Sequence, residues 1–127
     1  MTPLINWLYC QMIMDKQKAA RQKSRALVFK ALAHPSRISI VEALVEREHC
    51  VNELTNLLGI DASTTSRHLA ILRNAGLVSD EKRGACVYYR LQCTCVLTFI
   101  ECVESVISHR ADIDAGVPFE PAPSCRS

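Results

Sequence analysis

Three cysteines near the C-terminal end of the chain are the residues whose type and spacing most clearly allow chemistry. Cys93 and Cys95 are separated by one residue, and Cys102 follows seven residues after Cys95. A thiolate binds soft ions such as As(III), Sb(III), Cd(II) and Zn(II), and it is also the species that oxidants attack. The pair falls at the expected start of a helix, where backbone N–H groups and the helix dipole favour the thiolate. We therefore expect a metal(loid)-binding or redox-active site at Cys93, Cys95 and Cys102.

The spacing limits how these three sulfurs can act together. If the helix is regular from Cys95 onward, Cys102 lies about 10 Å further along its axis, which is too far for both to bind one ion. A shared site then needs a fold-back turn at Cys93 or Cys95, or a sulfur from elsewhere. Three sulfurs in a pyramid suit As(III) or Sb(III), and four in a tetrahedron suit Zn(II) or Cd(II). The alternative for Cys102 is simple packing beside Phe99 and Val103 on an apolar face.

The other cysteines show no comparable pattern. The chain has seven cysteines, an odd number, which argues against a disulfide framework and for thiol or metal chemistry at some of them. Cys10, Cys86 and Cys125 are interpreted as incidental. Cys50 is either a buried filler or a distant partner of the other thiols.

A second group of residues has the types and spacing of a DNA-reading helix. In the helix expected over residues 62–75, Leu69 and Leu72 fall on one side, and small polar residues with an arginine fall on the other. Short side chains let a helix enter the major groove, where arginine reaches guanine edges or phosphates. His68 points nearer the core side than Arg67, so a half-buried histidine is an alternative to a phosphate contact. The expected DNA-facing residues of this helix are Ser63, Thr64, Ser66, Arg67 and His68.

The elements around this helix complete a recognisable order. The sequence predicts a short helix over residues 51–58 that ends in a tight turn at Gly59. It also predicts a β-hairpin with strands over residues 77–79 and 85–91. Gly59 suits a left-handed helix cap. Lys82 and Arg83 lie in the hairpin turn, where a wing meets the DNA backbone. Helix, tight turn, helix and hairpin in this order are typical of a winged helix-turn-helix.

Three further helices complete a mainly α (α+β) fold with five helices and a two-stranded wing. They are expected over residues 16–33, 35–47 and 94–109. The last of them has a wide apolar face that includes Phe99 and Val103, and such a face requires a partner surface. A two-fold mate is the simplest partner. We therefore expect a homodimer formed through the first and last helices.

The length and composition are those of one domain. The 127 residues are 49% hydrophobic, and the net charge is only +2, so charge alone does not indicate nucleic acid. We expect an N-terminal extension over residues 1–15 that need not be ordered, a DNA-binding and dimerisation domain over 16–110, and a flexible tail over 111–127. The apolar stretch over residues 4–14 is too short to span a bilayer and lacks the basic start of a secretory signal. A cytoplasmic protein without a membrane partner is therefore expected.

Three motifs make the chain similar to the ArsR/SmtB family of bacterial metal-responsive repressors. They are VFKALAHPSR at residues 28–37, STTSRHLAILRNAGLV at 63–78 and VYYRL at 87–91. The resemblance extends over about residues 26–107. It implies a homodimeric winged helix that binds an operator when no inducer is present. It also implies release when a metal or metalloid, or in some members a thiol-oxidising species, occupies the sensor site. The implied recognition helix covers about residues 62–75, and the implied wing about 77–91.

The chain departs from one sensor design of that family. This design places a Cys-Val-Cys pair at the start of the third helix, whereas this chain has Cys50, Val51 and Asn52 there. Thr55 occupies the place of a further cysteine seen in some members. A self-contained trithiolate site is therefore not expected at this helix, and Cys93, Cys95 and Cys102 remain the candidates.

Together these features predict a dimeric DNA-binding transcriptional repressor that a thiophilic ion releases from its operator, with arsenite as the first guess. The alternative keeps the fold and makes the protein a cysteine-based redox or persulfide sensor. An enzyme is not expected, because no histidine with an acidic orienter accompanies a cysteine nucleophile and no glycine-rich phosphate loop is present. The expected partners are operator DNA, a second copy of the chain and the inducer.

Overall fold

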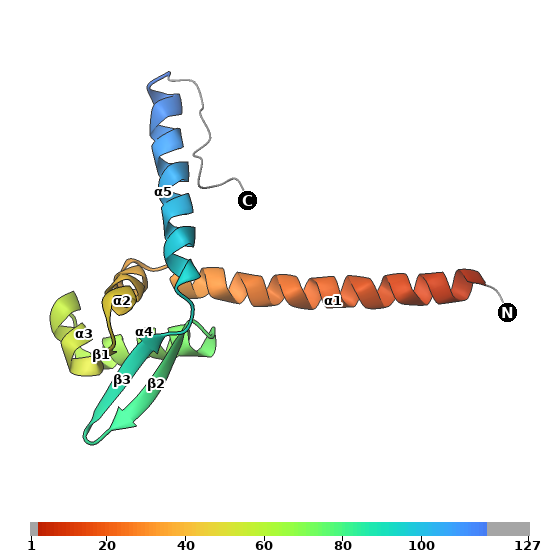
Figure 1. Ribbon diagram of the computed structural model, residues 1–127. Helices are drawn as coiled ribbons and strands as arrows, with labels where there is room; N and C mark the ends of the chain where they lie inside the picture. The colour runs from red at the N-terminus through yellow and green to blue at the C-terminus, as the bar shows by residue number, and fades with distance from the viewer. Residues whose placement is uncertain (1–2, 117–127) are drawn as a thin grey trace.

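The structure is a computed structural model that describes residues 3–116, and within that range it contains five helices and a three-stranded antiparallel sheet. The elements are α1 (Pro3–Leu32), α2 (Pro35–Glu46), β1 (His49–Cys50), α3 (Val51–Leu58), α4 (Ala62–Asn74), β2 (Val78–Arg83), β3 (Cys86–Leu91) and α5 (Cys95–Asp114). The strand order is β1-β3-β2. In Figure 1, α2, α3, α4 and the sheet form the body, while α1 and α5 extend from it in different directions.

One apolar core fixes the position of the helix that was expected to read DNA. The core is built from Ala31, Leu32, Ile40, Val41, Ala43, Leu44, Leu54, Leu69, Leu72, Leu77, Val78, Tyr89 and Val96. Leu69 and Leu72 of α4 are fully buried in it, and so are Ile40 of α2 and Leu54 of α3. Because close-packed interiors do not deform freely, α4 cannot rotate about its axis without disrupting this packing.

The helix boundaries in the body follow from capping residues. α2 begins after His34, whose Nδ1 accepts a hydrogen bond of 3.1 Å from the backbone N–H of Ser36, and Pro35 suits the first helical position. α3 ends at Gly59, which has φ 67° and donates its N–H to the Thr55 carbonyl at 3.0 Å. The predicted helix over residues 51–58 and its left-handed glycine are therefore confirmed.

The sheet is larger than the predicted hairpin. No strand was predicted between the helices over residues 35–47 and 51–58, but His49 and Cys50 form β1 and pair with Tyr89 and Tyr88 of β3. Two residues are too few to show the alternation that identifies a strand. β2 also continues to Arg83, where a turn over residues 80–84 was predicted, so the wing is longer and its turn is tighter.

The first and last helices are longer than predicted. α1 begins at Pro3 rather than near residue 16, so the described part of the expected N-terminal extension is helical. No glycine or internal proline interrupts residues 4–32, which explains the continuous helix. α5 ends at Asp114 rather than near His109; residues 117–127 of the expected tail lie outside the described residues. None of the described helices combines the length and apolar character needed to cross a lipid bilayer.

Candidate nucleic-acid interface and cysteine pair

The start of α4 is organised by the carboxylate of Asp61. Asp61 accepts hydrogen bonds from the Thr64 backbone N–H at 3.0 Å, from the Thr64 hydroxyl at 2.7 Å and from the Ser63 hydroxyl. The Ser63 and Thr64 hydrogen bonds hold the pKa of Asp61 well below its usual range. Both hydroxyl hydrogens are thus used to cap the helix. This constrains two of the residues predicted to face DNA.

The two sides of α4 differ sharply in exposure. Thr65, Leu69 and Leu72 are fully buried, as the helical spacing predicted. Ser66 and Arg67 are exposed on the other side. The helix therefore presents a hydroxyl and a guanidinium outward from a rigid support, which is the arrangement that major-groove reading requires.

His68 does not lie on the outward side of α4, so the half-buried alternative describes its position, and its contact with DNA stays a prediction. Its side chain is only 8% exposed. Its ring lies 4.5 Å from the ring of His34, between centroids, and its Nδ1 lies 3.4 Å from Nη1 of Arg37. Arginine only donates hydrogen bonds, so His68 Nδ1 accepts and the imidazole is neutral. Burial first, and then His34 and Arg37, lower the pKa of His68.

Arg37 connects this buried pair to the end of α1. Its guanidinium donates to the carbonyl oxygen of Ala31 at 2.6 Å and to that of Lys30 at 3.2 Å. These are carbonyls in the last turn of a helix, where a positive charge is favoured. Arg37 and His68 therefore connect α1, α2 and α4 at one point. A movement of α1 would change the contacts that hold α4.

The wing carries the other two residues predicted to contact DNA, and they differ in their surroundings. The side chain of Lys82 is exposed, and no side-chain hydrogen bond or ion pair is found for it within residues 3–116. Arg83 is 2.9 Å from Glu48 and 2.9 Å from Glu81, and its guanidinium lies 4.9 Å from the centroid of the Tyr88 ring. Glu81 and then Glu48 raise the pKa of Arg83.

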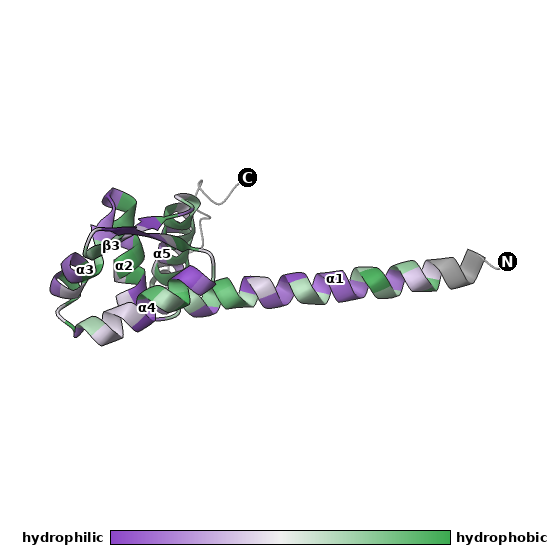
Figure 2. Ribbon diagram, turned by 90° about the horizontal axis from the view of Figure 1, so that it is seen from below, coloured by the Kyte–Doolittle hydropathy of each residue, from purple (hydrophilic) through white to green (hydrophobic). Residues whose placement is uncertain are grey.

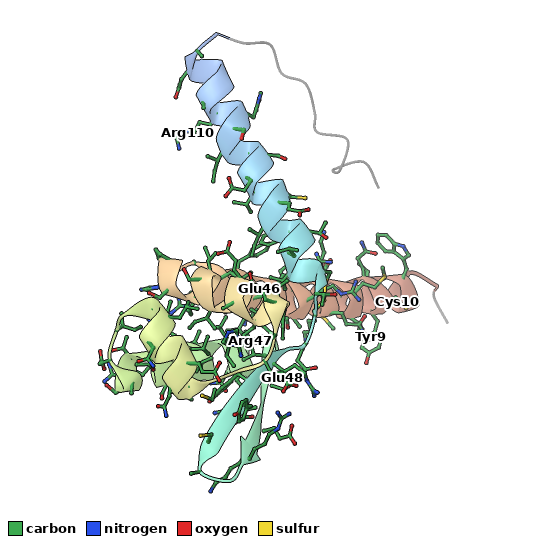
Figure 3. All side chains as sticks on the ribbon, turned by 60° about the vertical axis from the view of Figure 1, so that its left-hand side comes forward. Tyr9, Cys10, Glu46, Arg47, Glu48 and Arg110 are labelled. Carbon is green, nitrogen blue, oxygen red and sulfur yellow. A yellow bond between two sulfur atoms is a disulfide. The ribbon has the colours of Figure 1, made fainter. Side chains whose placement is uncertain are left out.

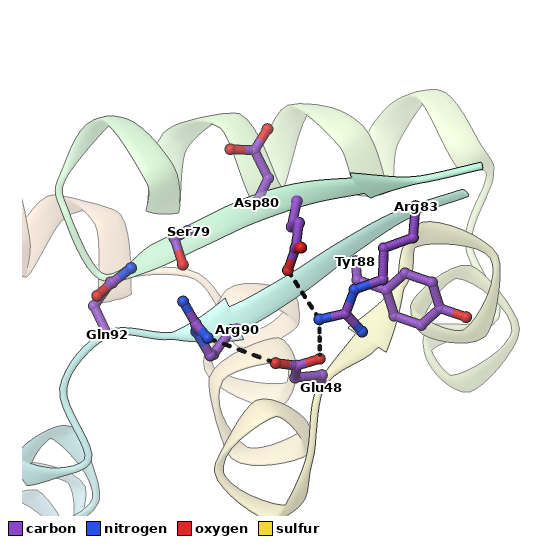
Figure 4. Close-up of a pocket in the computed structure, with 8 residues that line it drawn as sticks. Glu48, Ser79, Asp80, Arg83, Tyr88, Arg90 and Gln92 are labelled. Atoms are coloured by element: carbon purple, nitrogen blue, oxygen red, sulfur yellow. Dashed lines mark hydrogen bonds and ion pairs between the residues drawn. The ribbon is translucent and has the colours of Figure 1, made fainter. Parts of the chain in front are cut away.

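Figure 4 shows this network along a shallow cleft on one side of the sheet. The cleft, of about 220 Å³, is lined by Glu48, Ser79, Asp80, Glu81, Arg83, Tyr88, Arg90 and Gln92. Arg90 approaches Glu48 at 3.8 Å. Sequence reasoning missed Glu48, because it is 35 residues from Arg83 in the chain and only the strand β1, too short to predict, brings the two together.

The cysteine pair lies at the start of α5 and is oxidised. Cys93 and Cys95 are joined by a disulfide with Cα atoms 5.4 Å apart, and both residues are exposed. Cys102 is half-buried further along the same helix. The structure brings together the first two of the three predicted sulfurs and leaves the third two turns away.

The donor set of one chain does not complete a metal site. No three His, Cys, Asp or Glu side chains gather around a common point within the described part of the chain. Reduction of the pair supplies two thiolates, and Cys102 of the same chain lies too far along the regular helix to join them, so a third sulfur would have to come from elsewhere. Cys50 is buried and donates to Glu53 Oε1 at 3.6 Å, so it is a packed side chain beside the start of α3.

Comparison with known proteins decides the family. Residues 34–80 match the family model described as bacterial regulatory protein, arsR family. The transcriptional activator HlyU of Vibrio cholerae is 37% identical over 89 residues, which cover 69% of this chain and 82% of HlyU. The chain belongs to the ArsR/SmtB family. Members are transcriptional regulators rather than enzymes.

Other ArsR/SmtB relatives match over a shorter stretch. An uncharacterised HTH-type transcriptional regulator of Mycobacterium tuberculosis is 43% identical over 70 residues, covering 54% of this chain and 61% of that protein. The arsenic resistance transcriptional regulator ArsR1 of Pseudomonas putida is 46% identical over 66 residues, covering 51% of this chain and 52% of ArsR1. The matched segment therefore spans less than two thirds of the length of these two relatives.

Solved ArsR/SmtB-type structures share the fold. The homodimeric winged helix-turn-helix DNA-binding domain from Mycobacterium bovis, a possible ArsR-family regulator, superposes with a TM-score of 0.66 at 30% identity and covers 76% of this chain and 89% of that chain. Reduced HlyU from Vibrio cholerae gives a TM-score of 0.61 at 32% identity and covers 72% of this chain and 96% of that chain. The predicted winged helix-turn-helix is confirmed.

Proposed function

We propose that this protein is a homodimeric transcriptional repressor that binds operator DNA through α4 and the wing. The observation that carries this proposal is the orientation of α4, which buries Thr65, Leu69 and Leu72 and leaves Ser66 and Arg67 exposed. Two such helices, one in each subunit, would enter successive major grooves of a palindromic site. The homodimeric state of the Mycobacterium bovis relative supports the dimer.

The structure suggests an order of importance among the proposed DNA contacts. Ser66, Arg67 and Lys82 are exposed and have no competing ion pair among the described residues. The hydroxyls of Ser63 and Thr64 donate to Asp61, and a phosphate offers no hydrogen in return, so these two contact phosphate only by leaving Asp61. Ser66, Arg67 and Lys82 are therefore the proposed main DNA contacts. Arg83 contributes less, because Glu48 and Glu81 pair with it.

Fluorescence anisotropy on a labelled palindromic duplex tests this assignment. The Arg67→Ala variant should bind about 1–3 kcal/mol more weakly if arginine reads a base edge. Lys82→Ala should weaken binding to all sequences and reduce the slope of log affinity against log salt by about 1, as expected for one phosphate contact. Arg110→Ala, on the distal part of α5 (Figure 3), is the control with the same loss of charge. Equal effects of all three variants would reject the proposed interface.

We further propose that the thiols of Cys93 and Cys95 set the affinity for the operator. The observation that favours redox control is the disulfide that joins the two exposed cysteines. A hydroperoxide would remove two electrons and two protons from the pair, form the S–S bond, and be reduced to an alcohol and water. The disulfide form would then have the lower affinity, with a coupling of about 1–3 kcal/mol.

Release by arsenite or another thiophilic ion is the second candidate for the same pair. The Cα separation of 5.4 Å keeps the two sulfurs close after reduction, so they can displace two hydroxides of arsenite as water and chelate one As(III). The name of the Pseudomonas putida relative, an arsenic resistance regulator, supports this candidate. Operator-release titrations of the reduced protein with As(III), Cd(II), Zn(II) and a hydroperoxide distinguish the two. Release at one equivalent of As(III) without disulfide formation would favour the metalloid, and release only with disulfide formation would favour redox control.

A further inference from the structure

A cavity lies between the body end of α1 and the start of α5, beside the cysteine pair. In Figure 1, α5 leaves the body where α1 joins it, and Figure 2 shows apolar residues on both helices there. The volume of the cavity is about 250 Å³, which is below the ~300–1,000 Å³ of pockets for drug-sized ligands. The cavity therefore suits a small molecule or one part of a longer one.

The walls of this cavity are apolar, and the core holds part of them in place. They are formed by Val28, Phe29 and Leu32 of α1 and by Val96 and Phe99 of α5. Leu32 and Val96 are buried members of the core. Phe29 and Phe99 are 55% and 37% exposed, and their rings lie 5.5 Å apart. The cavity therefore has a packed floor and an aromatic rim through which an apolar ligand can enter from solvent.

Two further residues of the lining carry chemistry that packing does not need. Cys95 lines the cavity and is one half of the exposed disulfide with Cys93. Arg25 also lines it, donates to Oε1 of Gln22 at 3.2 Å and has no carboxylate partner among residues 3–116. A redox-active sulfur and a positive charge without a counter-charge thus border one apolar space. This combination fits an apolar molecule that carries a carboxylate and a group that reacts with thiols.

We propose that this cavity binds an organic hydroperoxide with an apolar body and a carboxylate, the chemistry of a peroxidised fatty acid, and holds its peroxide group beside Cys95. This inference rests on the redox control of the proposed function and names the class of oxidant. The Cys95 thiolate attacks the terminal peroxide oxygen, the O–O bond breaks, and the alkoxide takes up a proton and leaves as an alcohol. The Cys93 thiol then attacks the sulfenic sulfur, the S–S bond forms, and water leaves. Two electrons pass from the two sulfurs to one peroxide.

Rates of disulfide formation in the reduced full chain test this binding site. The oxidants are linoleic acid hydroperoxide, its methyl ester and hydrogen peroxide, with N-acetylcysteine as the reference for intrinsic reactivity. The acid should react at least about 10-fold faster than hydrogen peroxide, because apolar contacts in a pocket supply such a factor, and about 2- to 5-fold faster than the ester. Phe99→Ala should lower the preference for the lipid over hydrogen peroxide about 10-fold. Leu97→Ala, at a residue of α5 with similar exposure that does not line the cavity, should keep this preference. Arg25→Gln should remove the advantage of the acid over the ester.

Chemical trapping identifies the attacking sulfur without a rate measurement. In Cys93→Ser no second thiol of the pair can close the disulfide, so the lipid hydroperoxide should leave a sulfenic acid on Cys95, which dimedone labels for mass spectrometry. If the wild type and Phe99→Ala show the same preference, the cavity is not the binding site and side chains of this or the partner subunit fill it. Disulfide formation with hydrogen peroxide would then leave redox control intact. If none of the three oxidants forms the disulfide, redox control and this inference are both overturned.

Discussion

Nη2 of Arg83 lies 2.9 Å from Oε2 of Glu48, so the arginine at the end of β2 is paired with an acid that precedes β1. The same nitrogen is 2.9 Å from Glu81, and the guanidinium also lies over Tyr88. Both carboxylates contact the same nitrogen, and their negative charge offsets the attraction of this arginine for a DNA phosphate. Glu48 is therefore a competitor of DNA for the wing.

The first prediction concerns this competition. Glu48→Gln should tighten operator binding up to about 5-fold, because an exposed ion pair is worth about 0.2–1 kcal/mol and its loss makes Arg83 available. Fluorescence anisotropy at fixed salt measures the change. Glu53→Gln is the matched control: Glu53 is also paired with an arginine, Arg47 at 2.8 Å, but it belongs to α3. Equal tightening by both variants would show that only net charge matters.

The combination with Arg83→Ala identifies which residue responds. In the Glu48→Gln background, Arg83→Ala should remove the gain in affinity, whereas in the wild type it should change the affinity little. If Arg83→Ala costs the same in both backgrounds, Glu48 does not restrain Arg83 and the competition described above does not exist.

The second prediction concerns the pH dependence of stability through His68. Its pKa is lowered in the folded protein, chiefly by burial, so the unfolded chain takes up a proton more readily. The folded state should therefore lose stability as the pH falls below the ordinary value of 6.5, by at most about 1.4 kcal/mol per pH unit from this one group. Above that value His68 has no effect on the slope.

Denaturant unfolding between pH 8 and about pH 5 measures this slope in the wild type and in His68→Gln. The variant keeps a polar side chain of similar size but cannot be protonated, so its stability should fall less steeply below pH 6.5. His109→Gln, on α5, removes a histidine outside the Arg37 cluster and is the control. Parallel curves for the wild type and His68→Gln would assign the acid sensitivity to other groups.

The sequence predicts those parts of this structure that depend on local spacing. The inward side of α4, the Gly59 cap and the helix over residues 51–58 follow from periodicity and from the conformation that glycine permits. The side-chain contacts at the candidate interface cannot be predicted from local spacing. Helical spacing placed His68 nearer the core than Arg67 but left a phosphate contact open, because its burial depends on His34 and Arg37, which are more than 30 residues away in the chain.

The extent of α1 shows a different limit. An apolar stretch without its own core partner was interpreted as an extension outside the domain, yet it continues as helix from Pro3. Its large apolar side chains are exposed in one chain, because they do not pack against the core of their own domain. Contacts between subunits depend on which side of a helix faces away from the body. The residue pattern of that side can be interpreted only after the structure shows which side it is.

The third prediction concerns the cap of α4. Asp61→Ala removes the acceptor of the Thr64 N–H and of the Ser63 and Thr64 hydroxyls, so the melting temperature should fall. Asp61→Asn keeps a capping side chain and should melt closer to the wild type. The pKa of Asp61 is lowered in the folded state, so its contribution is present above the ordinary value of 3.8 and is lost as the pH falls below it.

Circular dichroism melts of these variants near neutral pH and near pH 3 check both statements. The difference between the wild type and Asp61→Ala should shrink in acid, because below its ordinary pKa the Asp61 carboxyl takes up a proton in the unfolded chain, which favours unfolding of the wild type. Asp61→Asn also removes a negative charge beside Ser63 and Thr64, so it should bind DNA more tightly than the wild type. Weaker binding by Asp61→Asn would instead indicate that the carboxylate positions these hydroxyls for the duplex.

The fourth prediction separates the sulfurs of α5. If the Cys93–Cys95 pair carries redox control, Cys93→Ser and Cys95→Ser should each abolish release of the operator by a hydroperoxide, and Cys102→Ser should respond like the wild type. If the inducer is As(III) held by three sulfurs, Cys102→Ser should also weaken the response, because the pair supplies only two of the three ligands. Operator-release titrations of the three variants, with thiols counted by mass spectrometry, decide between these patterns. A normal response to both agents in all three variants would move the sensor away from α5 altogether.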